Sequence, residues 1–328
     1  MVISNCFDNL SNELLFEIFD YLSFNDLIKS FFGLKQQLNN IIQAYPSKID
    51  LSHRIDNNTF QYGSFCCQSL KIFGNDQHKL QMIISYLNFA NLQAVTFSSM
   101  NLTNLKFLIE QLPMKQLESI IITDINTYHD PESIQQQIWL MIMTSGRDCL
   151  RYLDVPHGIS KFNVKQMQFD LSVLERLIFR SISNNQTLAL MHYTPNLYYC
   201  KIYLHDRMTN PSVVDVRLLK LSHVYLTINV DWLFEDFCRF FTISPHLKHL
   251  TVVLNVQEKC LDESSAWKTL IELYLPDLIY FYLHFDVKEY PDHYIYPRCN
   301  LSSFNNDEYW LQRRPQFQVT QNVQEICL

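Results

Sequence analysis

Two small groups of side chains in this 328-residue sequence are the best suited to catalysis or metal binding. Cys66 and Cys67 are adjacent, and neighbouring thiols can supply a nucleophile. His246 and His249 lie three residues apart, but no cysteine or carboxylate stands near them at the spacing of a metal site. Because Cys67 falls on a core position of the repeat described below, we expect buried thiols and solvated imidazoles at these positions.

Motifs for other chemistries are absent from the sequence. It contains no G-x-S-x-G nucleophile motif, no phosphate-binding loop and no dinucleotide-binding glycine pattern, and its five glycines cannot build such loops. The sequence therefore predicts a non-catalytic protein that needs no cofactor and no metal.

Composition narrows the class of protein further. The formal charge is −7 and no run of Lys or Arg stands out, so neither a nucleic acid nor a membrane is an expected partner. The N-terminus lacks the features of a signal peptide, and apolar stretches such as residues 138–143 are far shorter than a membrane span. The nine cysteines form no C-x-x-C pair and are expected to be reduced. We expect a cytoplasmic or nuclear protein.

The elements that position side chains follow from a repeat. The pattern is Leu-x-x-Leu-x-Leu with conservative replacements, and its units recur at intervals of about 26 residues, within the range of leucine-rich repeats. The units begin at Cys67, Leu92, Leu117, Leu150, Leu174, Leu197, Leu221, Leu247 and Leu278.

The fourth and sixth positions of a unit lie two residues apart, so in a strand they point to the same face. Amphipathic helical stretches separate the strands, for example after Asp130-Pro131-Glu132 and after Asp231. Such units bury a core only by stacking. We therefore predict an α/β fold in which residues 46–286 form a degenerate leucine-rich-repeat-like solenoid, with a parallel concave sheet and helices on the convex side. Residues 287–328, which are aromatic and interrupted by proline, are expected to cap its end.

The third, fifth and seventh positions of each unit should face away from the core. In the middle and late units they are rich in tyrosine and basic residues, which are common at the centres of protein interfaces. The predicted substrate-binding residues are Tyr152, Arg176, Arg180, Tyr199, Lys201, Tyr203, Tyr225, Tyr280 and Tyr282. Basic groups among aromatic ones suit an acidic or phosphorylated segment of a partner. The alternative is an ordinary tyrosine-rich sheet face in contact with solvent.

Residues 1–45 predict three short helices. Leu14, Leu15, Ile18, Phe19 and Leu22 follow one another at helical spacing and form a single apolar stripe. Three helices of this size expose more apolar surface than they can bury among themselves. The surplus needs either another protein or the solenoid itself, which the helices would then merely cap.

The run from Leu10 to Leu22, followed by Asp26-Leu27, resembles the F-box motif: Leu-Pro-x-Glu, two hydrophobic residues, and later Ile-Phe-x-aromatic-Leu and Asp-Leu. Ser11 stands where the family has proline, and the family's later tryptophan is missing. The array that follows is similar to the repeat half of F-box/leucine-rich-repeat proteins.

This resemblance implies a substrate-recognition subunit of an E3 ubiquitin ligase of the SCF type, in which a Skp-type adaptor links the F-box protein to a cullin. The alternative is a leucine-rich-repeat interaction scaffold unrelated to ubiquitination. By resemblance, the residues that form or support the adaptor-binding surface are Leu10, Ser11, Leu14, Leu15, Ile18, Phe19, Leu22 and Leu27. Some of these must pack the three helices together, and the sequence does not separate the two groups.

Overall fold

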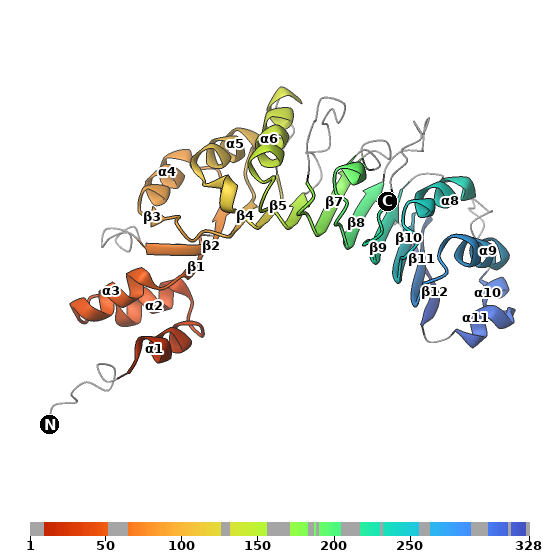
Figure 1. Ribbon diagram of the computed structural model, residues 1–328, viewed down its shortest axis with the longest axis horizontal. Coiled ribbons are helices and arrows are strands. Elements are labelled where there is room, and N and C mark those ends of the chain that lie inside the picture. Colours follow the sequence, from red (N-terminus) through yellow and green to blue (C-terminus); the bar gives the residue numbers. More distant parts are fainter. Residues whose placement is uncertain are drawn as a thin grey trace. The chain divides into compact units, whose positions relative to one another are not determined.

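The computed structural model (Figure 1) describes residues 10–51, 65–125, 132–155, 171–182, 187, 190–204, 217–229, 232–255, 263–289, 301–313 and 316–325. The chain divides into two compact units, residues 1–130 (unit 1) and 131–328 (unit 2). No helix in the described part of the chain has both the length and the apolar character needed to cross a membrane.

Unit 1 begins with the three predicted helices, α1 (Asn12–Phe19), α2 (Phe24–Phe31) and α3 (Gln36–Ala44). Serine hydroxyls cap the first two: Ser11 accepts a hydrogen bond from the Leu14 amide at 3.4 Å, and Ser23 accepts one from the Asp26 amide at 3.2 Å. Between α2 and α3, Gly33 has a φ of +86°, a conformation that side chains disfavour, so the glycine permits the sharp turn.

The rest of unit 1 alternates strands and helices: β1 (Ser47–Asp50), β2 (Phe65–Phe73), α4 (Gln77–Ser85), β3 (Leu87–Asn88), β4 (Ala94–Ser98), α5 (Leu102–Gln111), a 3-10 turn (Met114–Gln116) and β5 (Ser119–Thr123). The strands pair in parallel in the order β1-β2-β4-β5, and β3 pairs with the start of β2. Because the pairing follows chain order, each repeat stacks on the one before it.

The N-terminal helices and the first strands of unit 1 share one core. Phe24 at the start of α2 and Phe32 after its end both contact the ring of Phe65 in β2, with ring centroids 5.2 and 5.7 Å away. Phe65 is completely buried. The three helices are therefore anchored to the first repeat.

Unit 2 contains α6 (Glu132–Ser145), β6 (Tyr152–Val155), β7 (Arg176–Ile182), β8 (Tyr199–Leu204), β9 (His223–Ile228), α8 (Phe234–Thr242), β10 (His249–Leu254), α9 (Ser264–Tyr274) and β11 (Tyr280–Glu289). Its strands form a parallel sheet in chain order. This mixed α/β architecture with stacked parallel strands is consistent with the predicted solenoid-like repeat.

Alternation along the strands of unit 2 separates two faces. The fourth and sixth positions of the repeats are buried, and helical side chains pack on them: Trp139 of α6 stacks on Phe179 at 5.2 Å, and Trp267 of α9 lies 5.5 Å from Phe281. In Figure 1, α8 and α9 lie on the same side of the strands. The third, fifth and seventh positions consequently point to the side opposite these helices.

Backbone hydrogen bonds before each strand align the repeats of unit 2. A carbonyl at the second position accepts two amides of the next repeat. For example, the Glu175 carbonyl accepts from Tyr198 and Tyr199 at 2.9 and 3.2 Å, and the Lys248 carbonyl accepts from Ile279 and Tyr280, both at 2.9 Å. Equivalent residues of successive strands therefore lie side by side in straight rows.

Asparagine side chains after the strand ends connect some neighbouring repeats. The Asn75 side chain accepts a hydrogen bond from the Asn101 amide at 2.7 Å, and the Asn255 side chain donates to the carbonyl oxygen of the Asn229 side chain. These contacts link neighbouring repeats where asparagine is present.

The C-terminal segment contributes a strand of its own. After the short helices α10 (Ser302–Asn306) and α11 (Glu308–Gln312), β12 (Phe317–Glu325) pairs in parallel with β11. Trp310 of α11 contacts Phe281 and Phe317 at 5.7 and 6.0 Å. Residues 301–325 therefore cover the last predicted repeat by adding one more strand-containing layer.

Candidate protein-interaction surfaces

The eight candidate residues of the N-terminal helices fall into two groups. Leu15, Phe19 and Leu27 are almost completely buried, and Phe19 packs against Phe31 and Tyr45 at 5.8 and 5.4 Å. Through Phe19, this buried set joins α1 to α2 and to the end of α3. Ser11 is exposed and serves as the helix cap.

The four remaining candidates are Leu10, Leu14, Ile18 and Leu22. Together with the exposed Tyr21, which was not a candidate, they form what we call the α1 surface. Leu14 is 47% exposed and Tyr21 is 90% exposed, while the other three are half-buried. Leu14 and Ile18 are four residues apart and lie on one side of α1, and Leu22 follows in the turn after the helix.

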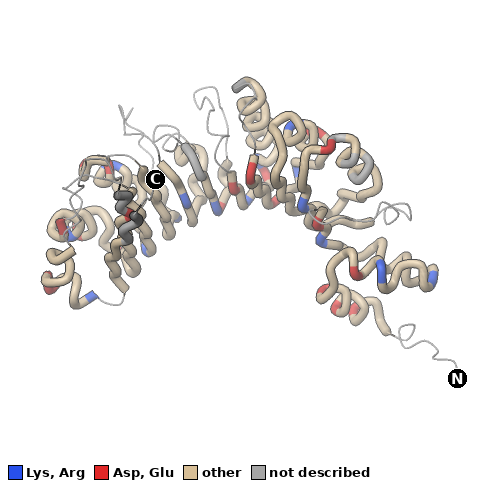
Figure 2. The backbone as a smooth tube through the Cα atoms, turned by 180° about the vertical axis from the view of Figure 1, so that it is seen from behind, with Lys and Arg blue, Asp and Glu red and all other residues tan. Residues whose placement is uncertain are grey.

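Acidic groups border the α1 surface. Glu13, Glu17 and Asp20 are exposed (the acidic positions are red in Figure 2), and Asp20 accepts a hydrogen bond of 2.5 Å from the Tyr45 hydroxyl. Burial, and then this hydrogen bond, raise the pKa of Tyr45, so the phenol stays protonated and fixes the end of α1 to the end of α3. An apolar stripe with an acidic border suits a partner with an apolar groove and basic neighbours.

Unit 2 presents the second candidate surface, which we call the open face. It comprises the third, fifth and seventh positions of β6–β11. The described side chains of the predicted candidates lie there, half-buried or exposed: Tyr152, Arg176, Tyr199, Lys201, Tyr203, Tyr225, Tyr280 and Tyr282.

Arg180 is the exception among the predicted substrate-binding residues. The register between β7 and β8 shifts between Phe179 and Ile182, where β7 has one residue more than its partner. Arg180 lies within this bulge, and its side chain is outside the described part of the structure. Its predicted place on the open face is therefore not established.

The third positions of the open face form a continuous stacked row: Tyr152, Arg176, Tyr199, His223, His249 and Tyr280. The Arg176 guanidinium lies between two tyrosine rings, 5.3 Å from Tyr152 and 4.9 Å from Tyr199. His223 and His249 stack almost parallel at 4.2 Å. The row continues at 6.5 Å from Tyr199 to His223 and at 6.0 Å from His249 to Tyr280.

Lys201 provides a second cation beside the stacked row. Its ammonium lies 4.4 Å from the ring centroid of Tyr225 and 5.6 Å from that of Tyr203. Rings at these distances attract the cation but leave its charge in place.

Sequence reasoning left His223 and His249 out of the predicted binding residues, although both occupy third positions of the repeat. Burial is the main reason that the pKa of His223 is lowered, and the charges of His249, Arg176 and Lys248 add to the effect. The imidazole is therefore mostly neutral at neutral pH. Its Nδ1 lies 2.8 Å from the Ser222 hydroxyl.

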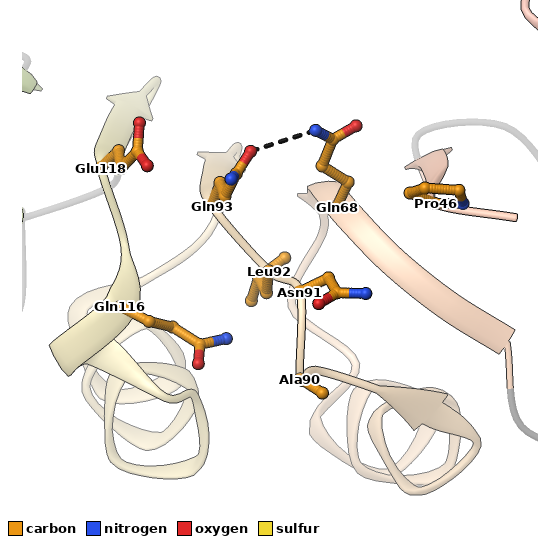
Figure 3. Close-up of a pocket in the computed structure, with 8 residues that line it drawn as sticks. All are labelled: Pro46, Gln68, Ala90, Asn91, Leu92, Gln93, Gln116 and Glu118. Carbon is orange, nitrogen blue, oxygen red and sulfur yellow. Dashed lines mark hydrogen bonds between the residues drawn. The ribbon is translucent and has the colours of Figure 1, made fainter. Parts of the chain in front are cut away.

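A polar hollow of about 310 Å³ opens in unit 1 beside the starts of β2, β4 and β5 (Figure 3). Gln68 donates to the side-chain oxygen of Gln93 at 3.0 Å, and Gln116 donates to the Phe89 carbonyl. The residues that line the hollow are Pro46, Gln68, Ala90, Asn91, Leu92, Gln93, Gln116 and Glu118. Because the lining includes no Cys, His, Lys or Arg and several of its amides bond to neighbouring protein groups, it offers no evident reactive or anion-binding group.

The thiols and histidines considered first lie as the sequence predicted. Cys67 is buried, and this burial raises the pKa of its thiol to about 12, so a thiolate does not form at neutral pH. His249 points to the open face, while His246 contacts Asp277, with Nδ1 2.8 Å from the carboxylate oxygen. Among the described residues, no three metal-binding side chains come together.

Comparison with known proteins gives little further information. No protein-family model matches the sequence, and no curated protein matches it significantly. A solved structure, the crystal structure of a Rad7 and Elc1 complex in yeast, aligns with 94% of this chain and 91% of the matched chain, at 15% sequence identity and a TM-score of 0.39. A TM-score this low does not establish a shared fold.

Proposed function

We propose that the chain is the substrate-recognition subunit of an SCF-type E3 ubiquitin ligase. In this proposal the α1 surface docks a Skp-type adaptor, which connects the chain to a cullin, and the open face holds a protein substrate. The chain itself is a receptor without catalytic activity. One observation carries the proposal: the F-box-like residues divide into a buried set that builds the three helices and an exposed apolar set on one side of α1.

The roles of the motif residues follow from this division. Leu14, Ile18 and Leu22 contact the adaptor, because their side chains retain exposed apolar surface that a partner can cover. Leu15, Phe19 and Leu27 support that surface from below. Ser11 holds the first turn of α1 through its cap and takes the place of the family's proline at little cost.

A second candidate function is a repeat scaffold whose N-terminal helices only cap the first repeat. The contacts of Phe24 and Phe32 with Phe65 favour it, because such contacts are what a cap requires. Deleting residues 1–45 would not separate the two functions, since either way Phe65 loses its cover. A change confined to the exposed α1 surface does separate them.

The decisive experiment is co-purification of the full chain with a co-expressed Skp-type adaptor. We expect Leu14→Glu to reduce the recovered adaptor at least tenfold, because a carboxylate would be buried in an apolar interface. Leu14 is 47% exposed, so the variant should remain folded by circular dichroism. Ile18→Glu should act in the same direction with some loss of stability, since Ile18 is half-buried.

Leu273→Glu is the matched control, because it makes the same change at a leucine of α9 that is 69% exposed. It should leave adaptor recovery unchanged. Failure of the intact chain to bind the adaptor, or equal binding by Leu14→Glu, would contradict the proposed docking and favour the scaffold.

A further inference from the structure

Ring stacking limits what the open face of unit 2 can offer a ligand. In the stacked row the Arg176 guanidinium carbon lies over the rings of Tyr152 and Tyr199, and His223 and His249 stack at 4.2 Å. The rings at either side of the histidine pair, Tyr199 and Tyr280, lean over it at 32° and 31°, with centroid distances of 6.5 and 6.0 Å. The groups left for a partner are the edges: phenol hydroxyls, imidazole nitrogens and guanidinium N–H groups. These edges supply hydrogen-bond donors but few free ring faces, an arrangement that suits anionic oxygens better than stacked nucleobases.

Within the described part of the chain, no salt bridge neutralises the two cations of the open face, Arg176 and Lys201. The one acidic residue at the described third, fifth and seventh positions of β6–β11 is Asp154, which is buried. Figure 2 shows mostly uncharged residues along the backbone, and the chain carries a net charge of −7. A cationic face on an acidic protein calls for an acidic partner.

The distance between Arg176 and Lys201 on the open face indicates which conformation of an acidic partner would fit. Arg176 and Lys201 lie on neighbouring strands and two residues apart in register, because Arg176 pairs with Tyr199. A strand separation of about 4.8 Å and a rise of about 3.3 Å per residue place their Cα atoms roughly 8 Å apart. Alternate side chains of an extended peptide are about 7 Å apart and point the same way. Two carboxylates at positions i and i+2 can therefore reach both cations.

We propose that the open face binds an extended acidic peptide segment in which aspartate or glutamate alternates with other residues. Arg176, held between two tyrosines, offers its N–H groups to one carboxylate, and Lys201 pairs with the next. Tyrosine hydroxyls and the imidazoles of His223 and His249 donate further hydrogen bonds along the row. This inference deepens the proposed function, on which it rests for the view that the segment belongs to a substrate.

The test is fluorescence anisotropy of the full chain with a fluorescein-labelled peptide that alternates Glu and Ala over ten residues. We expect saturable binding that weakens as salt is raised, because the attraction is between charges. Arg176→Gln and Lys201→Gln should each weaken binding about tenfold, which corresponds to about 1.4 kcal/mol. Arg239→Gln on α8 removes the same charge from the helical side and should leave the affinity unchanged.

Four further outcomes would overturn the inference. They are no binding of the Glu–Ala peptide at low salt, equal binding of a Gln–Ala peptide, tighter binding of a labelled oligothymidine, and tenfold tighter binding when phosphoserine replaces glutamate. The last would assign the face to phosphorylated segments instead. Peptide binding is measured without an adaptor, so loss of adaptor docking and loss of acidic-peptide binding are separate results.

Discussion

At the scale of single residues, the repeat pattern predicts which strand side chains share a face of the sheet. It does not predict how deeply each side chain is buried. A repeat of known period fixes which side chains share a face, so Tyr199, Lys201 and Tyr225 could be placed on the open face from the sequence alone. The split of the α1 candidates depends on contacts from distant residues such as Tyr45, which no local pattern reveals. The bulge at Arg180 was also invisible, because the run from Ile178 to Ile182 reads as continued alternation.

Protonation of the histidine pair gives a prediction at this scale. Burial and nearby positive charge lower the pKa of His223, and the groups around it are Tyr199, Arg176, Ser222, Lys248 and His249. An acidic peptide stabilises the protonated form, so its binding should tighten about threefold to tenfold between pH 7.5 and 5.5, where glutamates of pKa about 4.3 stay ionised.

Anisotropy titrations across that pH range check the prediction. The double variant His223→Gln/His249→Gln should bind with an affinity that hardly changes with pH, and an unchanged pH dependence in this variant would contradict the role of the pair. Without peptide, lowering the pH has the opposite effect: it destabilises the folded protein. A lowered folded-state pKa means that stability is complete above the unfolded value of about 6.5 and declines as pH falls below it.

At the scale of elements, the repeat predicted most of the parallel sheet. The elements that it missed or misplaced have local causes. The strand β12 was missed because Phe317 and Val319 occupy the fourth and sixth positions while Arg314 stands where a leucine is expected. The helical stretch expected after Asp231 begins only at Phe234 as α8, because the Asp236 side chain accepts a hydrogen bond from the Leu233 amide at 3.0 Å. Alternative capping residues of this kind can shift the start of a helix by two or three residues.

The shared core of the N-terminal helices and β2 leads to a prediction about stability. Phe65→Ala removes a fully buried ring that Phe24 and Phe32 contact, so it should lower the free energy of unfolding of unit 1 by about 3–5 kcal/mol. Urea denaturation followed by circular dichroism measures this change. Phe73→Ala, at an exposed position of the same strand, is the control and should cost far less. Equal losses in the two variants would show that the helices do not depend on this contact.

At the scale of the whole molecule, the two candidate surfaces belong to different compact units. The α1 surface is built by residues 10–22 of unit 1, and the stacked row by residues 152–280 of unit 2. No side chain contributes to both surfaces. This division matches what a receptor needs, because one surface must hold a constant adaptor while the other is specialised for its ligand.

Separate surfaces predict that the two binding activities can be removed one at a time. Leu14→Glu should strongly reduce adaptor recovery and leave the affinity for the Glu–Ala peptide within about twofold of the original, because changes in separate compact units without shared partners act independently. Arg176→Gln should do the opposite. Both measurements on both variants, with Leu273→Glu and Arg239→Gln as controls, complete the comparison. If either variant removed both activities while remaining folded, the surfaces would be coupled, and a receptor with two independent sites would be the wrong description.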